Sequence, residues 1–298
     1  MGRDSVLTDE QWARIEPLLP SSAGHPGRPF RDDRRVVEGI IYRYRCGIAW
    51  RDVPAGFGPW QTLWKRHRRY SGDGTWDRIL AALLGEAEKV GLIDWALSVD
   101  STIVRAHQHA ANLPRAPGER AGGAGPAAEP ADHALGCSRG GLTTKIHALT
   151  DGAGRPLVVL AGAGQGGDAP AFPVLMSALH VHPPGPARPR TRPERVRGDK
   201  AYSSTAIRTH LRSRHITAVI PEPADRQANR RRRGRNGGRP PAFDRQDYRE
   251  RNVIERFFGL LKQWRALATR FDKLALTYRG GTILRAITIW LKALGDTP

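Results

Sequence analysis

The sequence predicts an α/β protein in two parts. We expect an all-helical domain over residues 1–90, followed over residues 91–298 by a mixed sheet flanked by helices. In the first part, apolar residues recur three and four positions apart, which is typical of amphipathic helices. A run rich in β-branched residues at 96–104 then begins a series of short strand-like segments. Near the end, residues 248–262 have the pattern of one more amphipathic helix.

The first part contains signals for several helices. Thr8 and Gln11 form a capping box ahead of a helix that Pro20 ends. Further helices are expected over residues 32–44, 50–53, 60–70 and 76–90. The helix over 60–70 is basic, and short helices followed by a turn and a basic helix are typical of a helix-turn-helix DNA reader. The residues expected to contact DNA are Lys65, Arg66, Arg68 and Arg69. A plain helical bundle is the alternative.

Two aspartates stand where strands are expected. Asp100 is the single acidic residue of the apolar run 96–104, and Asp199 follows the short strand that begins at Arg195. A carboxylate in a buried strand costs free energy unless it is paired or used, so both are site candidates. From the residues alone, an ordinary turn aspartate or a buried ion pair is an equal alternative.

The remaining elements follow in a recognisable order. A hairpin is expected to turn at Asp151–Gly152, and Asp168 is expected to cap the helix after it. Ser203 or Ser204 opens another helix, and residues 216–220 form a further strand. Three strands, a helix, a strand, a helix, a strand and a final long helix is the order of a ribonuclease H-like fold. In that fold, groups on the first strand, the fourth strand and the last helix meet at one edge of the sheet.

Two segments are expected to be flexible. Residues 112–136 are rich in Gly, Ala and Pro and predict a mobile loop. Residues 224–243 place many arginines among glycines and prolines, and we expect this segment to become ordered on nucleic acid. The arginines expected to contact DNA there are Arg231, Arg232 and Arg233. A charge run that only aids solubility is the alternative.

The amphipathic helix expected over 248–262 has one polar and one apolar face. At about 100° per residue, one polar stripe is predicted on one side; it comprises Tyr248, Arg251, Glu255 and Lys262. The predicted core face, on the other side, comprises Val253, Phe257, Leu260, Leu261 and Trp264. A solvated helix face carrying ion pairs between residues four apart is the alternative.

Composition points to a polyanionic partner. The formal net charge is +19 and the isoelectric point is about 11.0, which favours nucleic acid. No apolar stretch is long enough to suggest a membrane anchor. Arginine dominates the basic residues, which also fits a GC-rich genome. Cys46 and Cys137 form no metal-type pair, which suits a reducing cytoplasm.

The spacing of the polar stripe resembles a known signature. Tyrosine, two residues, arginine, three residues, glutamate, six residues and lysine is the pattern of bacterial insertion-sequence DDE transposases. Residues 45–54 (Arg-Cys-Gly-Ile-Ala-Trp-Arg-Asp-Val-Pro), 101–111 and 199–202 (Asp-Lys-Ala-Tyr) resemble the insertion-sequence-five family. The resemblance implies that Asp100, Asp199 and Glu255 are catalytic and metal-binding. Arg251 and Lys262, with Tyr248, would hold the DNA.

The resemblance also implies a reaction. Two Mg²⁺ ions, with Mn²⁺ as a substitute, would neutralise the attacking and leaving oxygens of a phosphoryl transfer. Hydrolysis at the end of the element would free a 3′-OH, which then attacks target DNA. The partners are double-stranded transposon ends and target DNA, the expected assembly on DNA is at least a homodimer, and the expected location is the bacterial cytoplasm at the nucleoid. The alternatives are a ribonuclease H-like nuclease or resolvase without strand transfer, and a domesticated DNA-binding regulator.

Overall fold

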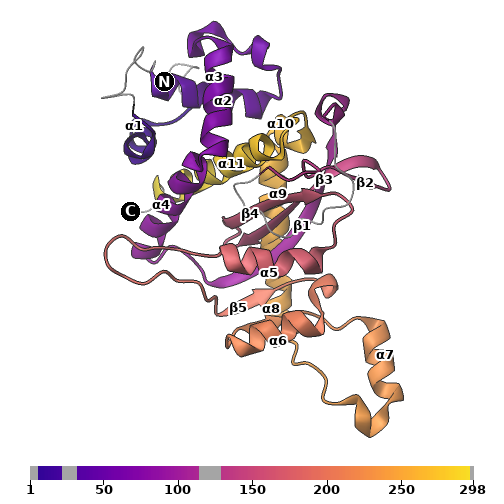
Figure 1. Cartoon of the computed structure of the whole chain (residues 1–298). Helices are drawn as coiled ribbons and strands as arrows, with labels where there is room; N and C mark the ends of the chain where they lie inside the picture. Colours follow the sequence, from indigo (N-terminus) through magenta and orange to yellow (C-terminus); the bar gives the residue numbers. More distant parts are fainter. Residues whose placement is uncertain (1–5, 22–31, 114–128, 296–298) are drawn as a thin grey trace.

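The computed structural model describes residues 6–21, 32–113 and 129–295. Its N-terminal part is helical (Figure 1). The predicted capping box is confirmed, because Gln11 N donates to Thr8 Oγ1 and Thr8 N donates to Gln11 Oε1. The helices of this part are α1 (Asp9–Ile15), α2 (Asp33–Cys46), α3 (Trp60–Gly72) and α4 (Thr75–Lys89), with short 3₁₀ turns η1 (Glu16–Leu18), η2 (Trp50–Asp52) and η3 (Ala55–Phe57).

The last helix of the chain belongs to the same helical layer. α11 (Ala275–Gly295) packs along α3 and α4, and Figure 1 shows it crossing between them and the sheet. Trp290 is fully buried and donates from Nε1 to the carbonyl of Pro156, which attaches α11 to the sheet. At the other end, Tyr44 Oη donates to Asp272 Oδ2 over 2.9 Å. The two ends of the sequence therefore share one core.

The sheet has the ribonuclease H-like order that the sequence predicts. The central strand β1 pairs antiparallel with β3, which pairs antiparallel with β4 and with the short β2. On its other side β1 pairs parallel with β5, and β5 pairs parallel with β6. The strands are β1 (Ala96–Ala106), β2 (Gly136–Ser138), β3 (Gly141–Thr150), β4 (Pro156–Ala163), β5 (Arg195–Arg197), β6 (Thr217–Val219) and β7 (Thr269–Arg270).

Helices cover both faces of the sheet. α9 (Val253–Lys262) packs on β1 and β3, and α5 (Asp168–Ala178) packs on β3 and β4. Asp100 contacts Arg251, which lies in the turn that leads into α9. The next residue, Ser101, contacts Asp168 of α5. Since successive side chains of a strand point to opposite faces, α5 and α9 lie on opposite faces of the sheet. The remaining helices are α6 (Thr205–Ser213), α7 (Ala224–Arg232), α8 (Arg245–Arg249) and α10 (Arg265–Ala268).

The helical segment that carries the polar stripe differs from the single helix expected over 248–262. It begins earlier, as α8 capped by Asp244, and passes through the 3₁₀ turn η7 (Glu250–Asn252) before α9. The expectation that Leu260 is a core residue is wrong, because its side chain is 37% exposed. Leu260 lies at the margin of the apolar stripe, while Ile254 and Phe258 fill the opposite margin and are buried.

The segment over 224–243 contains the helix α7 and the turn η6 (Gly234–Gly237). That this segment becomes ordered on nucleic acid stays a prediction. Its alanine, glutamine and arginines favour a helix, and Arg230 is held by Glu222 over 2.6 Å. Asp168 does not cap α5, since the N-cap residue is Gly167.

The expected loop over 112–136 lies mostly outside the described residues, and its last residue, Gly136, begins β2. Among the residues that the structure describes, no helix is long and apolar enough to cross a membrane.

Candidate active site

The two candidate aspartates follow the end of the pairing between β1 and β5. These strands run parallel, and their last registered pair is Ser98 with Arg197. Asp100 and Asp199 each lie two residues further along, and the charge of Asp199 acts on the pKa of Asp100, so the two carboxylates are near each other. Gly198 permits this approach, because a Cβ on it would lie 3.0 Å from Val99 Cγ1 and 3.3 Å from Tyr202 Cβ. Asp199 then caps the 3₁₀ turn η5 (Lys200–Tyr202), accepting from Ala201 N over 2.8 Å.

Arg251 joins the first aspartate to the glutamate of the polar stripe. Its Nη1 donates to Asp100 Oδ2 over 2.6 Å, and its Nη2 donates to Glu255 Oε1 over 2.8 Å. The Arg251 side chain is only 17% exposed, whereas that of Glu255 is 61% exposed. The guanidinium therefore forms a bridge from β1 to the first turn of α9.

The other members of the stripe lie around this bridge. The ring of Tyr248 lies 5.8 Å from the Arg251 guanidinium carbon, a cation–π distance. Lys262 is half-buried and donates to the carbonyl of Ile103 over 3.3 Å, further along β1. Arg251 and Lys262 thus contact β1 directly, while Tyr248 and Glu255 both contact Arg251.

Asp247 anchors this helical segment, a role that no sequence motif predicts. Its carboxylate accepts from Arg195 Nη1 over 2.8 Å and from Arg197 Nε over 2.6 Å, both on β5. Partial burial alone would raise the pKa of Asp247, but the hydrogen bonds from the two arginines lower it below its usual range. The contact fixes α8 against the strand that ends near Asp199.

Burial and like charge act on the carboxylates. Burial raises the pKa of Asp100, and the nearby Asp199 raises it further, although hydrogen bonds from Ser101 N and Arg251 oppose both effects. Burial would lower the pKa of Arg251, but Asp100, Tyr248 and Glu255 together raise it above its usual range. The site therefore holds negative charge that a cation neutralises.

A second polar group lies behind the aspartates, on the α5 face of the sheet. Asp168 Oδ1 accepts from Ser101 Oγ over 2.6 Å and from Lys145 Nζ over 3.1 Å. His147 Nδ1 lies 3.7 Å from the same oxygen, and burial lowers the pKa of His147 to about 4. Tyr202 is fully buried beside Phe172, and burial together with Asp168, Asp100 and Asp199 raises its pKa.

The sequence pointed to Asp168 only as a helix cap and gave no signal for its partners. Ser101 and His147 face each other across β1 and β3, a pairing that only the sheet register reveals. Within the described part of the chain, His147 Nδ1 and Tyr202 Oη have no hydrogen-bond partner.

The donor set suits a divalent cation, but its arrangement is not that of a closed metal site. Carboxylate oxygens are the ligands that hard divalent cations prefer, and a guanidinium already provides a cation between Asp100 and Glu255. Over residues 6–21, 32–113 and 129–295, no three His, Cys, Asp or Glu side chains stand close enough together to hold a metal ion. The carboxylates that could hold such an ion are those of Asp100, Asp199 and Glu255.

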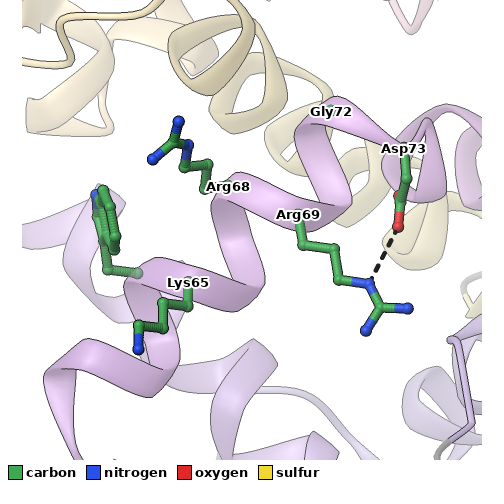
Figure 2. A pocket seen from close by; sticks show the side chains of 6 residues that line it. Lys65, Arg68, Arg69, Gly72 and Asp73 are labelled. Atoms are coloured by element: carbon green, nitrogen blue, oxygen red, sulfur yellow. Dashed lines mark ion pairs between the residues drawn. The ribbon is translucent and has the colours of Figure 1, made fainter.

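The basic helix α3 exposes most of its expected DNA-contacting residues. Lys65, Arg68 and Arg69 are exposed and line one hollow, as Figure 2 shows. Trp64 lines the same hollow. Arg68 lies 5.5 Å from the Trp64 ring centre, and Arg69 pairs with Asp73 over 3.5 Å.

Arg66 does not match this expectation. It is 7% exposed and donates to Asp33 Oδ1 over 2.9 Å and to Tyr70 Oη over 2.7 Å. We correct its assignment to an interior residue that joins α3 to α2.

The α7 segment exposes the other expected basic residues. Arg231, Arg232 and Arg233 are all exposed, and Figure 1 shows α7 projecting away from the sheet. Beside it lies a hollow lined by further arginines and a single acidic residue, comprising Arg208, Arg226, Arg230, Arg233, Arg239 and Glu222. Arg230 is paired with Glu222, so the hollow retains an excess of positive charge.

The chain resembles known families over most of its length. Residues 92–290 match the family model described as "Transposase DDE domain". The chain belongs to the DDE transposase family. Residues 7–80 of this transposase match the family described as "Putative transposase of IS4/5 family (DUF4096)". The insertion-sequence resemblance of the sequence is thereby confirmed, and transposases with this domain depend on divalent metal ions.

Individual relatives agree with the family. The "Insertion element IS402 uncharacterized 16.2 kDa protein" of Burkholderia cepacia is 37% identical over 34% of this chain and 74% of that protein. The "Putative transposase for insertion sequence element IS6501" of Brucella ovis is 31% identical over 51% of this chain and 100% of that protein. The solved "Crystal structure of a pre-cleavage Mos1 transpososome" aligns with 93% of this chain and 82% of its own, at 12% identity and a TM-score of 0.25.

Proposed function

We propose that this transposase binds the terminal inverted repeats of an insertion sequence, cleaves its ends and joins the freed 3′-OH to target DNA. The observation that supports the proposal is the Arg251 bridge between Asp100 and Glu255. Asp199 lies near this bridge, because its charge acts on the pKa of Asp100. Three carboxylates in this fold suit phosphoryl transfer, which requires neutralisation of developing oxygen charge.

The three carboxylates would hold the divalent ions, for which we propose Mg²⁺ with Mn²⁺ as a substitute. When bound, the ions supply charge neutralisation at the attacking and leaving oxygens. Asp100 lies on the central strand and Glu255 on a packed helix, so both ligands are placed by rigid elements. Lys262 and Arg251 would bind phosphates near the scissile bond, and Tyr248 would pack beside them. Phosphate contacts of this kind position the DNA without reading its sequence.

Two exposed basic surfaces would bind DNA away from the carboxylates. The surface on α3 comprises Lys65, Arg68 and Arg69, beside Trp64. The surface on α7 comprises Arg231, Arg232 and Arg233. We propose that α3 contributes the helix-turn-helix-like reading of the transposon end, and that residues 1–90 and 91–298 are a DNA-reading and a catalytic domain. Because two ends must be processed together, we further propose a homodimer or larger assembly on DNA.

The decisive experiment uses labelled duplexes made from the DNA that flanks the reading frame. With Mg²⁺ or Mn²⁺, the protein should cut at the element end and produce strand-transfer products joined to a target duplex. Cleavage without joining would indicate a nuclease of the resolvase kind. Binding without cleavage would indicate a DNA-binding regulator, and either result would overturn the proposal.

A salt titration tests the basic surfaces separately. Each phosphate neutralised should lower log K by about 0.9 per tenfold increase in salt concentration on duplex DNA. Replacing Arg231, Arg232 and Arg233 by glutamine should reduce that slope, while a slope near zero for the wild-type protein would contradict DNA binding. Sedimentation that shows one chain per pair of cleaved ends would contradict the proposed assembly.

A further inference from the structure

The guanidinium of Arg251 stands in the position that a metal ion would need. It forms ion pairs with Asp100 Oδ2 at 2.6 Å and with Glu255 Oε1 at 2.8 Å. These two carboxylates come from different elements of the fold. The second oxygen of Asp100 is also used, because Oδ1 accepts from Ser101 N over 2.8 Å. Both oxygens of Asp100 therefore have a donor within the protein.

A divalent cation and this guanidinium cannot share the same oxygens. Both are positive, and their repulsion is large in a site that is largely removed from solvent. The Arg251 and Asp100 side chains are 17% and 22% exposed, so water screens the contact only in part. A cation that takes Asp100 Oδ2 and Glu255 Oε1 must therefore displace Arg251.

A displaced guanidinium needs another anion. Arg251 is a planar fork that suits the oxygens of a phosphate as well as those of a carboxylate. Glu255 is 61% exposed on the same side, so the bridge opens towards solvent, where a DNA backbone can approach. Gly259 leaves this part of the helix uncrowded, since a Cβ there would meet nothing within 4 Å.

We propose that Arg251 couples metal binding to DNA binding by exchanging its carboxylate partners for a phosphate. Without DNA it holds Asp100 and Glu255 together and lowers the affinity of the site for divalent ions. When a phosphate binds the guanidinium, the carboxylates of Asp100 and Glu255 become available to a metal ion. When a metal ion binds these carboxylates, the guanidinium becomes available to a phosphate. By thermodynamic linkage the two effects have the same size. This inference rests on the proposed function, because it takes Asp100 and Glu255 as metal ligands.

The experiment is a Mn²⁺ titration of the full-length protein, read by the electron paramagnetic resonance signal of free Mn²⁺. Wild type, Arg251→Gln and the control Arg256→Gln are compared without DNA. Arg256 is exposed on the same helix and contacts Asn252 rather than a carboxylate. Without the competing cation, Arg251→Gln should bind Mn²⁺ about tenfold more tightly, a typical coupling. Arg256→Gln should match the wild type.

The second arm measures the affinity for a short duplex DNA with and without Mn²⁺. Mn²⁺ should raise the DNA affinity of the wild type about tenfold, and this ratio should fall towards one in Arg251→Gln. Arg251→Lys keeps the charge without the fork and should give an intermediate ratio, which covers the case of an unfolded glutamine variant. Unchanged or weaker Mn²⁺ binding by Arg251→Gln would overturn the inference. A wild type that binds Mn²⁺ but no DNA would instead contradict the proposed function.

Discussion

Asp168 Oδ1 accepts a hydrogen bond of 2.6 Å from the hydroxyl of Ser101, the residue that follows Asp100. Through this contact, α5 holds the central strand at the position of the catalytic candidate. The same oxygen also accepts from Lys145, which is only 11% exposed. Asp168 therefore neutralises the Lys145 ammonium and holds Ser101 in position behind the site.

Asp168→Asn should weaken Mn²⁺ binding and DNA cleavage by about 10- to 100-fold, as loss of a group that supports metal ligands does. The amide keeps the shape but leaves the Lys145 ammonium without its anion. Asp225→Asn is the matched control, because Asp225 is an exposed aspartate in the first turn of α7. Cleavage and Mn²⁺ affinity should be measured together. A variant that lost stability but kept its Mn²⁺ affinity would show that Asp168 serves the fold alone.

Two helical glycines should respond in opposite directions to alanine. A Cβ on Gly281 of α11 would lie 2.3 Å from Tyr44 Cε1, inside the shared core, whereas one on Gly259 of α9 would meet nothing within 4 Å. Gly281→Ala should lower the free energy of unfolding by about 2 kcal/mol through overpacking. Gly259→Ala should raise it by about 0.5–1 kcal/mol, because alanine favours the helix. Urea denaturation of both variants measures the pair, and equal effects would contradict the packing described.

His67 should make the protein less stable as the pH falls. Trp76 Nε1, which can only donate, lies 3.2 Å from His67 Nδ1, so that nitrogen must be unprotonated. Burial lowers the pKa of His67 from 6.5 to about 4. Between these values the unfolded chain binds the proton and the folded chain does not. The free energy of unfolding should therefore fall with decreasing pH, by up to about 1.4 kcal/mol per pH unit, and the effect should level off below the folded pKa.

Urea denaturation from pH 7 to pH 4.5 tests this sign. Other groups titrate in the same range, so the informative quantity is the difference from His67→Gln, which carries no titratable group at this position. The wild type should lose stability more steeply than the variant over this range. Parallel curves would mean that His67 binds a proton in the folded protein as readily as in the unfolded chain.

The sequence predicted the features that depend on local spacing. The order of strands and helices and the capping box at Thr8 follow from periodicity and cap residues, and the structure has them. The polar stripe was predicted in the same way, although η7 interrupts the helix that carries it. Leu260 was misplaced because helical periodicity gives the direction of a stripe but not its exact width.

The contacts that the sequence could not predict join distant residues. Arg251 and Asp100 are 151 positions apart, and the link between Asp168 and Ser101 spans 67. Asp168 fits a helix start equally well as a cap or as a first-turn acid, and only the folded sheet shows what it binds. Arg66 has the same surface-like sequence context as Arg68, but its buried side chain donates hydrogen bonds to Asp33 and Tyr70.

If Glu255 belongs to the metal-binding carboxylates, its charge is needed for cleavage but not for DNA binding. Glu255→Gln keeps the shape of the side chain and removes its charge, and Glu250→Gln removes an exposed charge from the adjacent turn η7. On duplexes carrying the element ends with Mg²⁺, Glu255→Gln should bind DNA within a few-fold of the wild type and cleave it slower by orders of magnitude. Glu250→Gln should cleave normally. Normal cleavage by Glu255→Gln would rule out a metal-binding role for Glu255, because the polar stripe would then be only a solvated helix face.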